Sequence, residues 1–345
     1  MSALAAPFPG AARRPPVVHL GRAFVHPLFD LLIIGSGLSL ALTPVFLWST
    51  HSPALGQRLE LWLPLLVLVS NSAHFAASTV RLYTKPGALR EMPFLTLGFP
   101  LATLLFLTLA IAFVDVIGRP LQMLYISWSP YHYAAQAYGL SLMYAYRSGC
   151  ALDDGDKRLM RLACLLPFAS SLIGGYSLLG TAWAEPRLWT MSVLGWVSFA
   201  LPAGLLMRLF WQRRAMLPLI SIAVLASNAV WLITLGRAGA FAWATVFHGL
   251  QYLAIVTIFH VKDRLKQPGN GHGWAWHTAT FYVGCLALGY LLFEVWPFAY
   301  VLLGYGVAES MLLVAAIINL HHFIVDAFIW KLRQAPNYSI VTDAV

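Results

Sequence analysis

Charged side chains are scarce in this sequence. Only 10% of its 345 residues are Asp, Glu, Lys or Arg, whereas 59% are hydrophobic, and the mean hydropathy is +0.72. A soluble domain of this length carries about 25% charged residues, so the scarcity argues against an ordinary soluble domain. Apolar runs recur from Leu28 to Trp330. These features predict an all-α fold, a polytopic transmembrane helical bundle in a lipid bilayer.

Cysteine is scarce as well. The three cysteines, Cys150, Cys164 and Cys285, form no CxxC pair, which argues against a disulfide framework and against a thiolate metal site. No nucleotide-binding motif is apparent. If the protein carries out a reaction that needs a reductant, the electrons would therefore have to come from a separate electron-donor protein. The net charge of +9 does not indicate a nucleic-acid partner, because the basic residues stand in short clusters at the ends of apolar runs, where they orient helices.

The apolar runs divide into about ten candidate spans. They lie near residues 28–49, 60–82, 94–116, 121–145, 160–182, 188–210, 217–235, 240–261, 275–296 and 298–330. With the N-terminus in the cytoplasm, 18 of the 22 basic residues fall in cytoplasmic segments, and only Arg58, Arg119, Arg187 and Arg237 do not. Because positive charge gathers on the cytoplasmic side of membrane proteins, this bias predicts that both termini are cytoplasmic. We expect the bacterial inner membrane as the location.

The two ends of the chain differ in composition from its middle. Residues 1–25 are rich in Pro, Ala and Arg, which predicts a disordered cytoplasmic tail. Residues 26–333 are expected to form a single transmembrane bundle, because no internal repeat is obvious. Residues 334–345 are expected to form a second cytoplasmic tail.

Five of the eleven histidines lie deep inside the apolar runs. They are His74, His132, His248, His321 and His322. Ionisable groups inside spans are costly and usually face the bundle interior. At about 1.5 Å per helical residue, all five lie roughly 10 to 22 Å from the nearest cytoplasmic basic residue. A lone histidine in a span is more often a packing element, but five at compatible depth predict one shared metal site.

Each deep histidine has polar neighbours at helical spacing. Such spacing places both groups on one helix face, and a metal-bound imidazole normally donates its second ring N–H to a polar partner. The candidates for this supporting role are Gln136, Gln251, Asp326, Asn319 and Tyr252. His321 and His322 are rotated by about 100° from each other, so they are expected to differ in role. The stripe with Asn319 and Asp326 favours His322 as the ligand, and the sequence leaves the choice open.

The donor set indicates which metal to expect. No carboxylate cluster suited to Mg²⁺ or Ca²⁺ occurs inside the runs, where Asp326 and Glu309 are the clearest acids. Nitrogen-rich sites suit iron, copper or zinc. Inside an apolar bundle this favours Fe²⁺ and oxygen chemistry, with copper as an alternative, or haem held by two axial histidines.

Three functions fit these residues. The first is a membrane-embedded, non-haem iron oxygenase or oxidase acting on an apolar small molecule, such as a carotenoid, another isoprenoid or an acyl chain. The second is a proton-coupled transporter or a haem-bearing electron carrier, in which buried histidines and Glu309 form a relay. The third is a structural or assembly subunit of a membrane complex, whose histidines only pack.

Three stretches of the sequence resemble a known family. They are "NSAHFAAS", "TVFHGLQYLAIV" and "HHFIVDAFIWK", which resemble segments of the Brp/Blh family, membrane-bound bacterial enzymes that cleave β-carotene to retinal. The resemblance implies a helical bundle whose histidines hold a non-haem iron that activates dioxygen. His74, His248 and His321 match family histidines, which favours His321 as a ligand. The family's early histidine–glycine motif is absent, and Tyr252 stands where its third motif has a second histidine.

Overall fold

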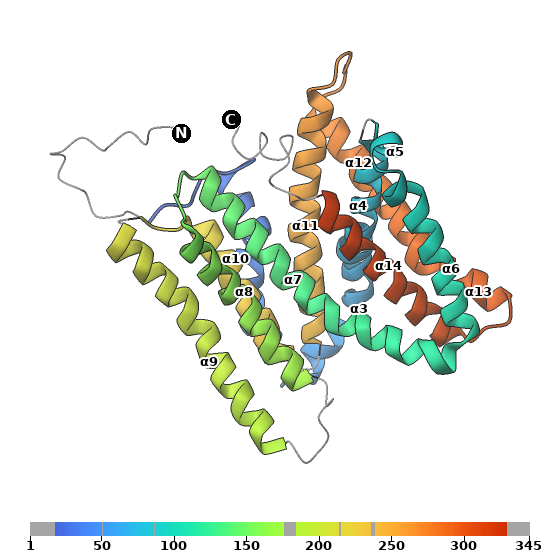
Figure 1. Ribbon diagram of the computed structural model, residues 1–345, viewed down its shortest axis with the longest axis horizontal. Helices are drawn as coiled ribbons and strands as arrows, with labels where there is room; N and C mark the ends of the chain where they lie inside the picture. The colour runs from blue at the N-terminus through green and yellow to red at the C-terminus, as the bar shows by residue number, and fades with distance from the viewer. Residues whose placement is uncertain are drawn as a thin grey trace.

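The fold is a bundle of helices (Figure 1). The computed structural model describes residues 18–49, 51–85, 87–175, 184–213, 215–235 and 239–329, and every regular element in these ranges is helical. Elements written η are π-helical turns. In chain order the elements are α1 (Pro27–Phe29), η1 (Asp30–Ile34), α2 (Gly37–Ser49), α3 (Pro53–Val67), η2 (Leu68–Ser72), α4 (Ala73–Thr84), α5 (Ala88–Glu91), η3 (Phe94–Gly98), α6 (Phe99–Ala112), η4 (Val114–Gly118), α7 (Arg119–Arg147), α8 (Asp154–Gly175), α9 (Ala184–Arg208), η6 (Leu209–Arg213), α10 (Leu219–Thr234), α11 (Ala240–Leu265), α12 (Trp274–Tyr290), η7 (Leu291–Val295), α13 (Trp296–Leu302) and α14 (Val307–Ile329).

Several helices are long and apolar enough to cross a membrane, which makes this an integral membrane protein. Six stretches meet that description among the described residues: Pro53–Thr84, Phe94–Ala112, Trp189–Gln212, Ala240–Leu265, Trp274–Leu302 and Val307–Ile329. A bent pair, Pro27–Ile34 with Gly37–Ser49, adds a seventh if it is one broken span. The count is therefore six or seven by length and composition. The ten spans and the cytoplasmic termini stay predictions.

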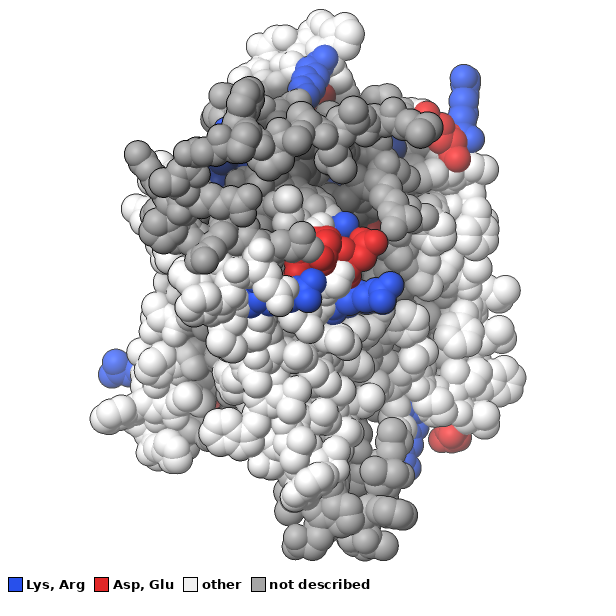
Figure 2. All heavy atoms as spheres, turned by 60° about the vertical axis from the view of Figure 1, so that its left-hand side comes forward, with Lys and Arg blue, Asp and Glu red and all other residues white. Residues whose placement is uncertain are grey.

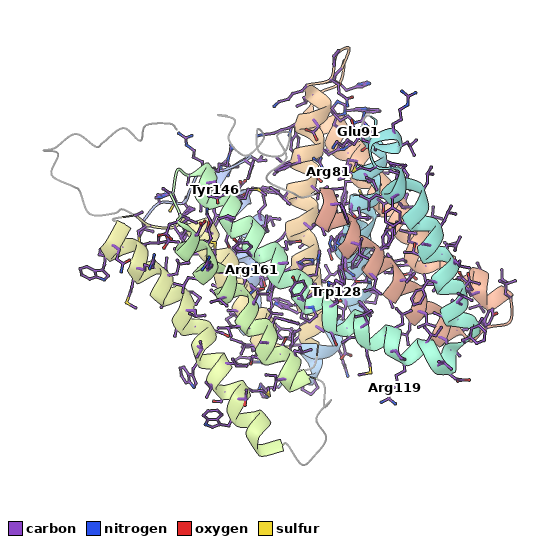
Figure 3. The ribbon with its side chains drawn as sticks, in the orientation of Figure 1. Arg81, Glu91, Arg119, Trp128, Tyr146 and Arg161 are labelled. Atoms are coloured by element: carbon purple, nitrogen blue, oxygen red, sulfur yellow. The ribbon has the colours of Figure 1, made fainter. Side chains whose placement is uncertain are left out.

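The outer surface suits a lipid environment. Figure 2 shows a face on which few side chains are charged, and these gather in small groups. Arg81 and Arg119 lie towards opposite ends of the bundle in Figure 3. Among the described residues, one charged group joins the end of α9 to the start of α8, where Arg208 forms ion pairs with Asp153 and Asp156.

The end of the predicted N-terminal tail packs against the bundle. Residues 1–17 lie outside the described residues, as does the predicted tail 334–345. From residue 18 onward the chain is placed, and Phe24 is buried. The buried carboxylate of Asp30 accepts hydrogen bonds from the backbone N–H of Phe24 (2.5 Å) and from the hydroxyl of Tyr144 (2.7 Å). An apolar side chain and a buried acceptor thus fix residues that composition alone assigned to a disordered tail.

Helix α11 lies at the centre of the bundle. In its most apolar stretch 83% of residues are buried, against 17% in Trp189–Gln212. Figure 1 shows α11 between α8, α9 and α10 on one side and α4, α6 and α12 to α14 on the other, while α7 runs across from the first group to the second. Residues on α11 can therefore be reached from both halves of the bundle.

Helix α7 bends near Pro130, which lies inside it. Proline removes one helical hydrogen bond and its ring crowds the preceding turn, so the sequence accounts for the bend. The first half of α7 packs against α14, and the second half packs against α8 and α10. Trp128 lies at the bend in Figure 3. The change of direction separates α7 from α14 beyond this point.

Two glycines allow α11 and α12 to approach the π-turn η2, directly before α4. A Cβ atom at Gly289 would lie 2.6 Å from the carbonyl oxygen of Ser72, and one at Gly249 would lie 3.0 Å from the carbonyl carbon of Ser70. Backbone atoms cannot move aside as a flexible side chain can. The close approach therefore needs residues without a Cβ, and it fixes the start of α4.

We predict that Gly289→Ala destabilises the protein, whereas Gly284→Ala on the same helix does not. The added methyl of Gly289→Ala forces α12 away from η2, at a cost of about 1–3 kcal/mol. At Gly284 a Cβ meets no atom within 4 Å, and alanine gains up to about 1 kcal/mol in helix propensity. Thermal unfolding of the detergent-solubilised variants measures the difference. Equal unfolding temperatures would contradict the close approach.

Candidate metal centre

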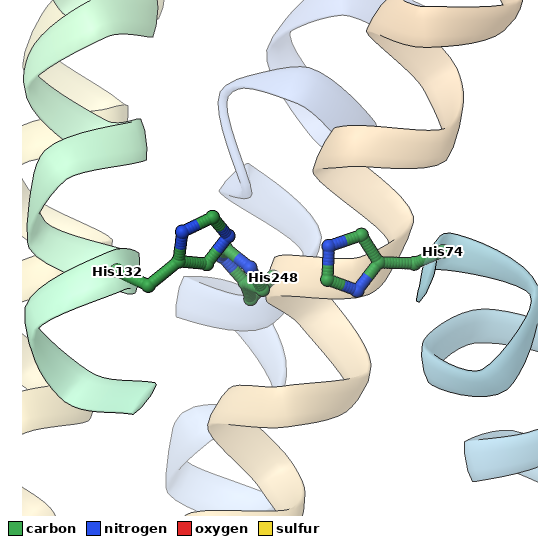
Figure 4. A group of neighbouring side chains, drawn as sticks. All are labelled: His74, His132 and His248. Atoms are coloured by element: carbon green, nitrogen blue, oxygen red, sulfur yellow. The ribbon is translucent and has the colours of Figure 1, made fainter. Parts of the chain in front are cut away.

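Four imidazoles from four helices meet in the interior. His74 comes from α4, His132 from α7, His248 from α11 and His322 from α14. The ring centre of His74 lies 4.4 Å from that of His322, 4.9 Å from that of His248 and 6.2 Å from that of His132. Figure 4 shows the rings of His74, His132 and His248 directed toward one another across the space between their helices.

The possible ligand atoms form two groups that share His132. One group is His74, His132 and His248, and the other is His132, His322 and Asp326. Within each group the nitrogen or carboxylate oxygen atoms all lie within 4.8 Å of one another. This spacing is compact enough for a single ion to bind three side chains after small adjustments of rotamer.

Two of these histidines have no hydrogen-bond partner among the described residues at either ring nitrogen. Both nitrogens of His74 and both of His248 are buried and unpaired, and each residue is 0% exposed. A buried polar atom without a partner costs about 1–3 kcal/mol, and such atoms are rare in folded proteins. A metal ion takes up an imidazole lone pair directly. The unpaired nitrogens are therefore the observation that fits a metal best.

His322 is positioned by a serine on another helix. Its Nδ1 lies 2.8 Å from Oγ of Ser78, and this oxygen lies 3.2 Å from the carbonyl oxygen of Phe75. When Ser78 donates its single hydrogen to that carbonyl, Nδ1 of His322 must donate to Ser78. Its Nε2 then carries a lone pair. This is the arrangement of a metal-binding histidine whose second nitrogen is held by a partner.

The lone pair of His322 faces a carboxylate and a second histidine. Its Nε2 lies 3.3 Å from Oδ2 of Asp326 and 3.3 Å from Nε2 of His132. Oδ1 of Asp326 accepts a hydrogen bond from the hydroxyl of Tyr252 at 2.5 Å. Three electron-rich atoms so close together repel one another unless a cation or a proton lies between them. Tyr252 fixes the carboxylate in this position.

The expected supporting residues divide into two sets. Asp326 contacts His322 one helical turn away, as the spacing predicted. The ring of Tyr252 lies against histidines of other helices, 4.5 Å from the ring of His74 and 5.3 Å from that of His322. The glutamines hold helices together instead: Nε2 of Gln251 donates to the carbonyl of Ile34 (2.9 Å), and Nε2 of Gln136 donates to the carbonyl of His248 (3.3 Å). Gln251 thereby satisfies a carbonyl at the break between η1 and α2, where Ser36 has φ +54°.

Two further expected residues lie apart from the four rings. Asn319 donates to the carbonyl of Ala315 on its own helix (2.7 Å). His321 points to the face of α14 that contacts α6, and its ring stacks on Phe99 with ring centres 4.9 Å apart. The rotation of about 100° between adjacent helical residues separates His321 from His322. The structure thus brings His322 into the cluster, and not His321, which the resemblance favoured.

Other contacts of the cluster escaped the sequence reasoning. Ser78 of α4 stands four residues after His74, yet its side chain binds His322 of α14. Phe323 stacks on His132 with ring centres 4.5 Å apart, and the ring of Tyr133 lies 4.2 Å from that of His248. Contacts between helices depend on lateral arrangement, which one sequence does not reveal.

A cavity of about 440 Å³ reaches the cluster from the angle between α7 and α14. His132, Tyr252 and Asp326 form its polar part, and the side chain of His132 is 11% exposed. The rest of the lining is largely apolar and aromatic, with Gln136 as a further polar residue: Trp128, Tyr131, Ala135, Gln136, Gly139, Leu140, Met143, Ile255, Phe323 and Ala327. Trp128 and Tyr131 are 37% and 38% exposed, so the cavity opens towards the outer surface of the bundle.

The comparisons with known proteins identify no family. No family model matches the chain, and neither a curated protein nor a solved structure is similar enough to count as a match. The resemblance to the Brp/Blh family therefore stays a prediction that rests on short stretches of sequence.

Proposed function

We propose that this protein is a membrane-embedded metalloenzyme, a non-haem iron oxygenase or oxidase that acts on a lipid-soluble substrate. The observation that carries the proposal is the convergence of His74, His132, His248 and His322 beside an apolar cavity, together with the unpaired ring nitrogens of His74 and His248. An ordinary packing histidine is expected to find a hydrogen-bond partner. Among the described residues His74 and His248 have none, and a bound cation would take up their lone pairs.

The metal ion would be held by the four imidazoles together with Asp326. Bound Fe²⁺ would supply the binding and activation of dioxygen. The protein's own side chains position the metal-binding groups. The hydroxyl of Tyr252 donates a hydrogen bond to the carboxylate of Asp326, which holds this carboxylate in place and lets it receive a proton from Tyr252. The aromatic and aliphatic cavity wall excludes water from the site, which suppresses side reactions.

The cavity supports an apolar substrate. Its mouth lies between α7 and α14, and its lining carries little polarity apart from Gln136 and the residues that contact the cluster. A carotenoid, another isoprenoid or an acyl chain enters such a cavity from the bilayer without crossing water. The chain has no nucleotide motif, so an electron-donor protein is the proposed source of reducing equivalents.

Iron fits the site better than haem. The ring centres of His74 and His132 lie 6.2 Å apart. The ring of His248 lies 4.9 and 5.1 Å from these two, and that of His322 lies 4.4 and 5.1 Å from them. Those two rings occupy the space that a porphyrin plane would need between axial ligands. Copper accepts the same donors, so metal analysis decides between it and iron.

The alternative functions have less support. Glu309, the acid proposed for a proton relay, lies in the first turn of α14 and is exposed. Glu309 therefore does not continue the buried histidine cluster into a proton relay. A purely structural role would suit histidines scattered on different helix faces, whereas four of the five converge.

The charge bias of the sequence supports an orientation. We propose both termini in the cytoplasm of a bacterial cell, with the protein in the inner membrane and additional helices among α7, α8 and α10 completing about ten spans. The basic residues of alternate loops support this topology.

The protein purified in detergent is expected to contain iron, and His322→Ala is expected to lose most of it. His321→Ala is the matched control, because the adjacent histidine lies outside the cluster. Elemental analysis measures iron per chain, and the absorption spectrum of the same sample should show no Soret band. Iron loss in both variants, or in neither, would contradict the assignment of His322. Folded wild-type protein without any metal would refute the proposal.

Ser78→Ala is expected to weaken metal binding without abolishing it. The variant removes the oxygen that holds Nδ1 of His322, and loss of such a partner typically costs about 10–100-fold in metal affinity. Ser198→Ala is the control, a buried serine of α9 that donates to the carbonyl of Leu194. Competition with a chelator measures retention of the metal. An unchanged affinity in Ser78→Ala would show that the contact does not orient the ligand.

A further inference from the structure

A second cavity, of about 390 Å³, lies where α11 ends and α12 begins. It is lined by Val80, Thr84, His260, Arg264, Gln267, Pro268, Gly269, Asn270, His277, Thr280 and Phe281. His260 and His248 are twelve residues apart on α11, which places this cavity about 18 Å from the histidine cluster along the helix. Figure 1 shows the connection between α11 and α12 at one extreme end of the bundle.

The lining of this cavity is rich in hydrogen-bond donors and holds no carboxylate. Arg264 supplies a permanent positive charge, and His260 and His277 supply imidazole groups. Asp263, on the same turn of α11, forms an ion pair with Arg81 at 3.0 Å, so its charge is already engaged. A concave surface with a guanidinium group and several neutral donors, but no anion of its own, is complementary to an anionic ligand.

The donors are held in place by the connection itself. Oδ1 of Asn270 accepts hydrogen bonds from Nε2 of His277 (2.8 Å) and from the backbone N–H of His272 (3.2 Å). Arg264 donates through Nη1 to Oε1 of Gln267 (3.1 Å). The ring of His260 stacks on Phe281, with ring centres 4.3 Å apart. The cavity is therefore a built feature with ordered walls.

Two exposed tryptophans follow shortly after Asn270, one of the residues that line the cavity. Trp274 and Trp276, in the first turn of α12, are 44% and 54% exposed. Tryptophan gathers where the hydrocarbon core meets the headgroups, and phosphate groups lie at that same level. Basic pockets at this depth are a recurrent way to bind lipid headgroups.

We propose that this cavity binds a phosphate group, either from the headgroup of an anionic phospholipid or from a soluble phosphate compound. Arg264 contacts the phosphate oxygens, and His260 donates a further hydrogen bond. The site is independent of the histidine cluster and of the metal proposed for it.

The test uses the full chain in detergent and two probes. One probe is dioleoyl phosphatidic acid in mixed micelles, with dioleoyl phosphatidylcholine as the zwitterionic control. The other is inorganic phosphate, with sodium chloride at equal ionic strength as its control. A ligand that binds only the folded state raises the unfolding temperature in a saturable way. A response to phosphatidic acid alone assigns the site to lipid, and a response to both probes assigns it to phosphate from either source.

Single-residue variants test whether the phosphate probes bind in this cavity. Arg264→Gln is expected to weaken the saturable response roughly tenfold or more, because it removes a charge-assisted contact. Lys266→Gln removes one charge at the same helix end but outside the cavity, and it should bind as the wild type does. If Arg264→Gln does not fold, His260→Gln takes its place with the same expectation. Absence of a saturable response to either probe, or equal weakening in the Lys266→Gln control, would overturn the proposal.

Discussion

The interior of this bundle depends on how four imidazoles from four helices are satisfied where they meet in a largely apolar interior. A nitrogen buried in an apolar interior loses the hydrogen bonds that it had in water. In most proteins a neighbouring donor or acceptor compensates for that loss, as Ser78 does for one nitrogen of His322. Among the described residues His74 and His248 have no such neighbour. Their nitrogens, and the carboxylate of Asp326 close to His322, are the atoms for which we propose a cation as the partner.

The helices are arranged so that this interior site can form. Helix α11 is buried along most of its length and carries both His248 and Tyr252. Gly249 and Gly289 let α11 and α12 approach the turn before His74. The bend of α7 brings His132 to the cluster and then leads the helix away from α14. The same bend thus gives both one histidine of the cluster and the apolar cavity that reaches it.

Much of this arrangement could be predicted from the sequence, and the limits have physical causes. Composition and apolar runs indicated a helical membrane protein, and depth along each helix placed the deep histidines at compatible levels. Helical spacing also found Asp326 as the neighbour of His322. Spacing could not show that Gln136 and Gln251 hold helices together, because their partners lie on other helices. Whether His321 or His322 faces the interior depends on the rotation of α14, which only packing against its neighbours determines.

The central claim is that a non-haem metal ion is bound by imidazole nitrogens from different helices. X-ray absorption spectroscopy at the metal edge of the purified protein tests it most directly, because the technique reports the ligand atoms themselves. We expect nitrogen and oxygen ligands, with the outer-shell scattering of at least three imidazole rings. Sulfur ligands, the scattering pattern of a porphyrin, or a metal surrounded by water oxygens alone would contradict it.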